Sequence, residues 1–111
     1  MSTKNFKLKP EEIVDLITPM GACFATDRIT VDGMKIGYMY REKAEEELDS
    51  GWRFFEGTES DEYVNDSNNV LLYAVNTIAN YDPAIILYLD LPYFTELERI
   101  EGTDQFQIIA Q

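Results

Sequence analysis

One segment, Met34-Lys35-Ile36-Gly37-Tyr38-Met39-Tyr40-Arg41, sets the expected fold class, because its side chains alternate in character along the chain. In an extended strand successive side chains point to opposite faces, so every second residue from Met34 to Tyr40 shares one apolar face. Asp32-Gly33 comes directly before this strand and is the strongest short hairpin signal in the sequence. We therefore expect a hairpin that joins Ile29–Val31 to the strand.

Shorter patterns on both sides of this segment extend the sheet. They predict strands at Gly21–Thr26, Trp52–Phe55, Val70–Val75 (buried on both faces), Tyr93–Arg99 and Gln105–Ala110. Helix-start and turn residues predict short helices at Pro10–Ile17, at Asp61–Asn65 and from Asp82-Pro83 to Leu89, and a turn at Asp49-Ser50-Gly51. The sequence thus predicts a single domain over its 111 residues, of α+β class. We expect a mainly antiparallel sheet with a few short helices packed on one side, as a single pair of layers.

Charge is the most informative feature of the composition. The sequence has 9 Lys and Arg residues against 21 Asp and Glu residues, which gives a net charge of −12. Such a chain repels phosphates and anionic membrane surfaces, so we expect neither nucleic acid nor a membrane as a partner. It attracts basic proteins and speeds their encounter. Acidity that serves only solubility is the alternative interpretation.

Three features of the sequence predict a cytoplasmic location. A single cysteine, Cys23, forms no internal disulfide and suits a reducing compartment. The stretch Met1–Pro10 is polar and lacks the apolar run of a signal peptide. The longest apolar stretch, Ala84–Leu89, is far shorter than the roughly 20 residues that span a bilayer.

The sequence offers little catalytic chemistry. It contains no histidine, which removes the common triads and the usual zinc and iron sites. Cys23 lies between Ala22 and Phe24 and resembles a small buried hydrophobe more than a nucleophile. Paired carboxylates remain available, but with 21 acids some pair falls at a suggestive spacing by chance. The acid- and amide-rich run 61–69 lacks the spacing of a calcium loop. We therefore expect no enzyme, no cofactor and no metal.

Four blocks in order carry a family resemblance: Asp27–Gly33, Gly37–Glu42, Asp49–Phe55 and Asn76–Pro83. Together they resemble a family of small bacterial domains that is also classed among the immunity proteins of polymorphic toxin systems (immunity protein thirty-three-like). The resemblance extends from about residue 21 to about residue 99. It implies a protein that binds and neutralises a cognate toxin, and it brings no catalytic residues.

We expect the partner to be a basic protein, such as a toxin, held by turns and strand ends that combine aromatic, arginine and acidic groups. The predicted partner-binding residues are Asp49, Trp52, Arg53, Phe55, Glu59, Asp61, Asn80, Tyr81 and Asp82. A purely structural interpretation competes with this one, with Trp52 as a core anchor and Asp82 as a helix cap. Two other functions stay open: a regulatory or scaffolding module that binds a peptide or small ligand, and a hydrolase that uses paired carboxylates.

Overall fold

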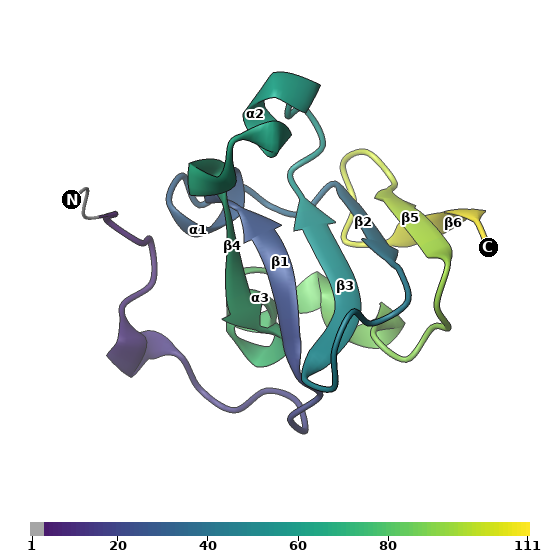
Figure 1. Ribbon diagram of the computed structural model, residues 1–111, viewed down its shortest axis with the longest axis horizontal. Helices are drawn as coiled ribbons and strands as arrows, with labels where there is room; N and C mark the ends of the chain where they lie inside the picture. Colours follow the sequence, from purple (N-terminus) through teal and green to yellow (C-terminus); the bar gives the residue numbers. More distant parts are fainter. Residues whose placement is uncertain (1–3) are drawn as a thin grey trace.

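A single sheet organises the computed structural model, which describes residues 4–111, so that Met1–Thr3 of the polar N-terminal stretch lie outside the described residues. Six strands of this part of the chain pair in the order β4-β1-β3-β2-β5-β6 (Figure 1). Their bounds are β1 Ala22–Thr26, β2 Tyr38–Arg41, β3 Asp49–Phe55, β4 Val70–Ala74, β5 Thr95–Arg99 and β6 Phe106–Ala110. Only β1 and β3 run parallel among these pairs. The predicted α+β class with a mainly antiparallel sheet is confirmed.

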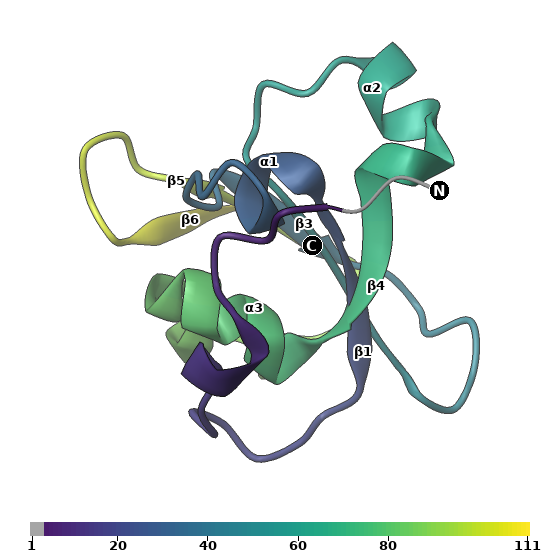
Figure 2. The same cartoon turned by 90° about the vertical axis from the view of Figure 1, so that its left-hand side faces the viewer.

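The helices are short and gather on one side of the sheet (Figure 2). Helices α1 (Asp27–Thr30) and α3 (Val75–Tyr81) and the 3-10 helix η3 (Pro83–Tyr88) pack there. Helix α2 (Asp61–Asn65) and the 3-10 turn η2 (Ser67–Asn69) stand at one end of the sheet, above β4 in Figure 1. One face of the sheet is therefore covered by helices and the other is not.

The core lies between the sheet and the helices, and it is built by alternation along the strands. In the central strand β3, Trp52 and Phe54 point to the helices with stacked rings whose centroids are 5.9 Å apart. The Trp52 indole Nε1 donates a hydrogen bond of 3.1 Å to the Leu89 carbonyl, which ties β3 to the end of η3. The remaining core side chains come from every layer: Cys23, Ala25, Ile29, Ile36, Met39, Val75, Ile78, Ala79, Ile85, Leu89, Leu97 and Phe106.

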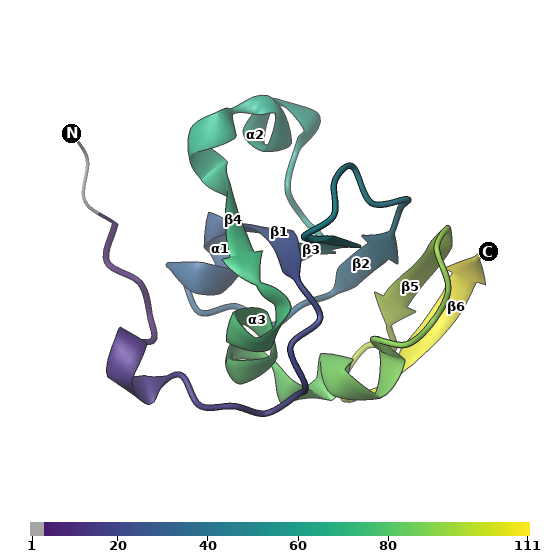
Figure 3. The same cartoon turned by 60° about the horizontal axis from the view of Figure 1, so that its bottom comes forward.

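The predicted helix at Pro10–Ile17 is wrong beyond its first turn. Only the 3-10 helix η1 (Pro10–Glu12) forms, and the chain after it runs past α3 into β1 (Figure 3). Its backbone amides bond to side chains of α3 instead of to carbonyls of its own helix. Asn76 Oδ1 accepts from Leu16 N at 2.8 Å, and Asn80 Oδ1 accepts from Val14 N at 3.1 Å. These amide side chains hold the N-terminal segment against the helical layer.

The predicted hairpin at Asp32-Gly33 is also wrong. The residues before it form α1, and Gly33 lies at φ +74° where that helix ends. Gly33 N donates to Ile29 O at 3.1 Å and Met34 N donates to Arg28 O at 2.9 Å, which closes the helix C-terminus. An Asp-Gly pair signals a positive φ, and a helix end satisfies it as well as a hairpin turn. The strand after it is shorter than predicted and begins at Tyr38.

Two further predictions are corrected by the sheet. Strand β4 is an edge strand, and Leu72 within it is 57% exposed, so this strand is not buried on both faces. The predicted turn at Asp49–Gly51 is the start of β3. Its turn chemistry makes a bulge instead, because Ala22 pairs with Asp49 whereas Phe24 pairs with Arg53. Gly51 supplies the positive φ of +89° at this bulge.

Candidate functional site

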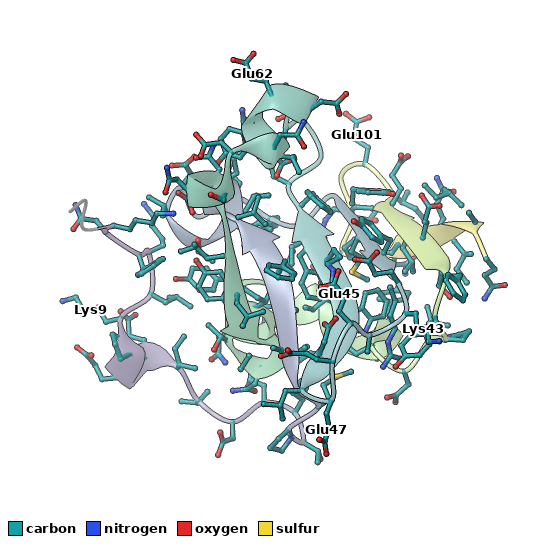
Figure 4. All side chains as sticks on the ribbon, viewed as in Figure 1. Lys9, Lys43, Glu45, Glu47, Glu62 and Glu101 are labelled. Atoms are coloured by element: carbon teal, nitrogen blue, oxygen red, sulfur yellow. The ribbon has the colours of Figure 1, made fainter. Side chains whose placement is uncertain are left out.

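The candidate site is the face of the sheet that no helix covers, which we name the open face. Register places its side chains: Phe24 pairs with both Leu72 and Arg53, and Tyr40 pairs with Arg53. Tyr38 pairs with Phe55 of β3 and with Glu98 of β5, and Tyr40 pairs with Glu96 of β5. The open face is thus defined by Phe24, Tyr38, Tyr40, Arg53, Phe55, Leu72, Glu96 and Glu98. It faces the viewer in Figures 1 and 4.

Aromatic rings occupy the centre of this face. The rings of Tyr38, Tyr40 and Phe55 form one cluster, with centroids 5.7–5.9 Å apart. All three side chains are half-buried, so their other surfaces meet solvent. The Tyr38 hydroxyl donates a hydrogen bond of 2.6 Å to Glu96 Oε1. The pKa of Tyr38 is raised mainly by burial and then by its hydrogen bond to Glu96. The pKa of Tyr40 is raised mainly by burial and then by the negative charge of Glu42. Both hydroxyls therefore stay protonated at physiological pH.

Beside the aromatic cluster lies a buried ion network centred on Arg53, which pairs with Tyr40 and is 4% exposed. Its guanidinium donates from Nη1 and Nη2 to both oxygens of Asp49 at 2.9 and 2.8 Å, and from Nε to Glu42 Oε2 at 2.7 Å. Nη1 also donates to the Trp52 carbonyl at 3.0 Å, and the guanidinium lies over the Phe24 ring, 4.9 Å from its centroid. The Arg53 bonds hold the pKa of Asp49 well below its usual range, and Asp49 in turn raises the pKa of Arg53. Asp49 and Arg53 are therefore both charged at every physiological pH.

Carboxylates surround the open face. Glu96 and Glu98 stand on β5, and the Glu42 carboxyl is 43% exposed at the end of β2. The loop that follows β2 adds three more acids and one lysine. Figure 4 shows Lys43, Glu45 and Glu47 of this loop around the lower part of the open face. This face therefore presents aromatic surface inside a rim of predominantly negative charge.

Two shallow hollows flank Tyr38 on this face. The first has a volume of about 270 Å³ and is lined by Tyr38, Tyr40, Arg41, Glu42, Phe94 and Glu96. The second has a volume of about 350 Å³ and lies between the sheet and α2, lined by Tyr38, Phe55, Gly57, Glu59, Asp61, Val64 and Asn65. Ordinary small-molecule pockets have volumes of about 300–1,000 Å³. The first hollow is smaller than this range and the second is near its lower limit, so each suits a side chain better than a drug-sized ligand.

Phe94 stands out at the edge of the first hollow. It is the one non-glycine residue with positive φ in the described part of the chain, at φ +73°, and its side chain is 65% exposed. Its backbone amide donates to the Arg41 carbonyl, which fixes the segment beside β2. A bulky residue at positive φ is strained by about 1–2 kcal/mol. The fold thus holds an exposed aromatic ring in a strained position next to a negatively charged hollow.

The structure places some of the predicted partner-binding residues at the open face and others in the core. Phe55 and Asp61 lie on or beside the open face, where they line the second hollow. Arg53 belongs to the open face, and Asp49 binds it in the buried network. Trp52 points the opposite way and is fully buried, so contact between its side chain and a partner is ruled out in this conformation. For Trp52 the competing interpretation as a core anchor is correct.

Glu59 lines the same hollow but is already occupied by structural bonds. Its carboxyl accepts from Thr26 Oγ1 at 2.7 Å and from the amides of Glu56 and Gly57, both at 2.8 Å. Burial raises the pKa of Glu59, but these hydrogen bonds outweigh burial and lower it overall. Glu59 therefore closes the turn after β3, which leaves Asp61 as the more available carboxylate of the two.

The predicted turn Asn80-Tyr81-Asp82 lies in the helical layer and is not brought together with Asp49–Phe55. Asn80 binds the N-terminal segment, and the Tyr81 hydroxyl accepts from Leu8 N at 3.2 Å. Asp82, 2% exposed, accepts from Ala84 N at 3.2 Å, from Ile36 N at 3.0 Å and from Arg99 Nη2. Asp82 is thus a helix cap and a buried link between layers, so these three residues hold the fold together.

The sequence reasoning missed five residues of the site. They are Tyr38, Tyr40, Glu42, Phe94 and Glu96, which line the first hollow. The alternation of residues 34–41 marked the two tyrosines as one apolar strand face, and such a face is usually expected in a core. The core side of β2 is in fact the side of Met39, which is fully buried. No local signal joins Phe94 and Glu96 to β2, because they come from the far end of the chain.

Chemical groups suited to catalysis are sparse in residues 4–111. Burial raises the pKa of the Cys23 thiol far above its usual range, so this side chain is an unreactive core residue. No group of three or more His, Cys, Asp and Glu side chains within residues 4–111 is arranged to hold a metal ion. No helix in this range is both long and apolar enough to cross a membrane.

The fold and the open face together define a small α+β protein with a partly exposed aromatic and acidic sheet surface. A family model described as the Immunity protein Imm33 domain matches residues 23–110. The chain belongs to this family of immunity proteins. The match reaches past residue 99, where the sequence resemblance ended, and takes in β6. Neither the curated proteins nor the solved structures include a significant match to this chain.

Proposed function

We propose that this protein binds a cognate toxin through the open face and neutralises it by occlusion, in the cytoplasm and without catalysis. Family membership supports an immunity role. The open face supports the place of binding, because the helices and the N-terminal segment cover the opposite face of the sheet. Partly exposed aromatic side chains inside a charged rim are typical of a protein interface.

The charge of the protein indicates the chemistry of the toxin. A net charge of −12 and the acids around the open face favour a partner whose contact surface is basic. Aromatic rings at the centre supply apolar contact area, and the carboxylates at the rim orient the partner and speed its encounter. The bound toxin is inhibited because its own active surface is covered. Family membership favours the immunity role over the two alternative functions.

The direct experiment is co-expression with a toxin domain encoded beside this chain. We expect growth to be restored by the immunity protein and a complex of the two purified proteins to form. The association rate should fall about tenfold or more between low and physiological salt, because screening weakens charge steering. Stopped-flow fluorescence at two ionic strengths measures this rate. An association rate that is indifferent to salt would contradict the basic character of the partner.

Phe94 offers a test that separates binding from folding. Phe94→Gly removes the exposed ring and also relieves the positive φ of +73°, so stability should stay within about 1 kcal/mol of the wild type. The Kd for the toxin should nevertheless rise about tenfold or more, as for an aromatic interface residue. Urea denaturation and titration calorimetry give the two quantities.

The matched control for Phe94 is Leu87, which lies on η3 in the helical layer and is 88% exposed. Leu87→Gly removes an apolar side chain of comparable exposure from the other side of the molecule. We expect it to leave the Kd for the toxin unchanged. Equal losses of affinity for the two variants would show that the open face is not the binding surface.

A further inference from the structure

We infer that the first hollow, between Tyr40, Phe94, Glu42 and Glu96, is a binding site for a single arginine side chain of the partner. This inference rests on the proposed function for the identity of the partner. It adds the chemical group that enters the site and the residues that receive it. The hollow of about 270 Å³ is open to solvent, and its lining combines aromatic side chains with the carboxylates of Glu42 and Glu96.

The two carboxylates are only partly used by the fold. Glu42 accepts from Arg53 through Oε2, and Glu96 accepts from the Tyr38 hydroxyl through Oε1. Within residues 4–111, no hydrogen bond reaches the other oxygen of either group. The bonded oxygens fix the two side chains in place, so the remaining oxygens are pre-positioned acceptors at the hollow. Such acceptors favour a donor that carries positive charge.

The geometry favours a guanidinium over an ammonium group. Guanidinium is planar, stacks on aromatic rings and carries five donors that can reach carboxylates in two directions. Aromatic side chains line the hollow from β2 and from Phe94, while its acids stand at the ends of β2 and on β5. A lysine ammonium is a compact, strongly hydrated charge that gains less from ring stacking.

The arginine that already lines the hollow does not fill this role. The Arg41 guanidinium donates to the carbonyls of Ser50 at 2.9 Å and Leu91 at 2.8 Å. It lies over the rings of Trp52 and Tyr93, at 5.8 and 4.9 Å from their centroids. Its charged end is therefore engaged with the helical side of the sheet, and the acids of the hollow are left for a cation from outside.

The inference is tested on the full-length protein with small probes, without the toxin. Nα-acetyl-arginine methylamide is titrated into ¹⁵N-labelled protein, and the amide shifts of Tyr38–Arg41 and Phe94–Arg99 are followed. The isosteric neutral citrulline derivative and the lysine derivative serve as comparison probes. Glu96→Gln removes a negative charge from the rim of the hollow. Its matched control, Glu98→Gln, removes a negative charge two residues further along the same face of β5.

We expect saturable shifts confined to the hollow with the arginine probe and none with the citrulline probe. Affinity should fall about three- to fivefold in Glu96→Gln, as for a partly exposed ion pair, and should not change in Glu98→Gln. Equal weakening by the two variants, or equal shifts with citrulline, would overturn the site. A lysine probe that binds as tightly as arginine would overturn the assignment to guanidinium. Failure here together with toxin binding at the open face would leave the proposed function standing.

Discussion

Replacing Arg53 by alanine is expected to lower the free energy of unfolding by about 3–5 kcal/mol at pH 7, a large fraction of the stability of a small domain. The side chain is 4% exposed, and Asp49 beside it is 7% exposed. Removal of the guanidinium leaves the Asp49 carboxylate buried without its counter-charge and leaves two more acceptors, on Glu42 and Trp52, without this donor. The loss therefore appears in folding and not as a specific loss of partner binding.

The pH dependence of this variant gives a second signature. The folded-state pKa of Asp49 lies below its unfolded value of about 3.9. The pair with Arg53 therefore adds stability above that pH, and this stability is lost as the pH falls toward the folded pKa. In Arg53→Ala the carboxylate is unpaired and buried, so acid relieves its penalty. The difference in stability between wild type and variant should shrink from pH 7 to pH 4.

Urea denaturation at pH 7 and pH 4 measures both effects. Arg53→Lys is the matched control, because it keeps the charge and loses the two parallel hydrogen bonds to Asp49. It should be destabilised less than the alanine variant. A loss below about 1 kcal/mol for Arg53→Ala at pH 7 is the size expected of an exposed ion pair and would contradict the buried network.

The second large effect is expected for Trp52→Ala, at about 3–5 kcal/mol. The indole is fully buried, stacks on Phe54 and donates to the Leu89 carbonyl at 3.1 Å. Truncation leaves a cavity between the sheet and η3 and removes the donor that satisfies this carbonyl. Thermal and chemical denaturation with circular dichroism measure the loss.

Trp52→Phe keeps most of the ring volume and loses the indole N–H. It should cost about 1–3 kcal/mol, the penalty of a buried carbonyl without a partner. Because the side chain faces the helices, the toxin affinity of the folded variant should equal that of the wild type. A Kd that rises more than about threefold while the protein stays folded would place Trp52 in the interface after all.

How far the sequence predicts this structure depends on how local each feature is. The strand Trp52–Phe55 follows from its own composition, and the cap at Asp82-Pro83 follows from two adjacent residues; both are present in the structure. Gly33 has the positive φ that an Asp-Gly hairpin turn needs, but the residues before it fold as α1 and the pair ends a helix.

The candidate site depends on contacts that no local pattern encodes. In a regular strand, residues four positions apart are about 13 Å apart, too far for a salt bridge. Asp49 reaches Arg53 at 2.8 Å because the bulge at Gly51 shortens β3. The open face likewise needs the pairing of β2 with β5, which joins distant parts of the chain. The sequence therefore predicted Asp49 and Phe55 near the site but missed Tyr40 and Glu96.

The central claim is that the toxin binds the open face. Two variants test it most directly, and each of them replaces two acidic residues by lysine. Glu98→Lys with Asp61→Lys changes exposed acids on and beside the open face. Glu11→Lys with Asp90→Lys changes exposed acids on the helical side, one in η1 and one just after η3. No hydrogen bond of residues 4–111 involves these four side chains, so folding is expected to be unaffected in both.

The two variants have the same net charge, and only the face that carries the change differs. The measurement is the Kd for the toxin by titration calorimetry at about 0.1 M salt, where the screening length is about 10 Å and charges on the far side act weakly. We predict that affinity falls about tenfold or more for the open-face variant and less than about twofold for the other. Equal losses, or a larger loss for Glu11→Lys with Asp90→Lys, would contradict the assignment of the binding face.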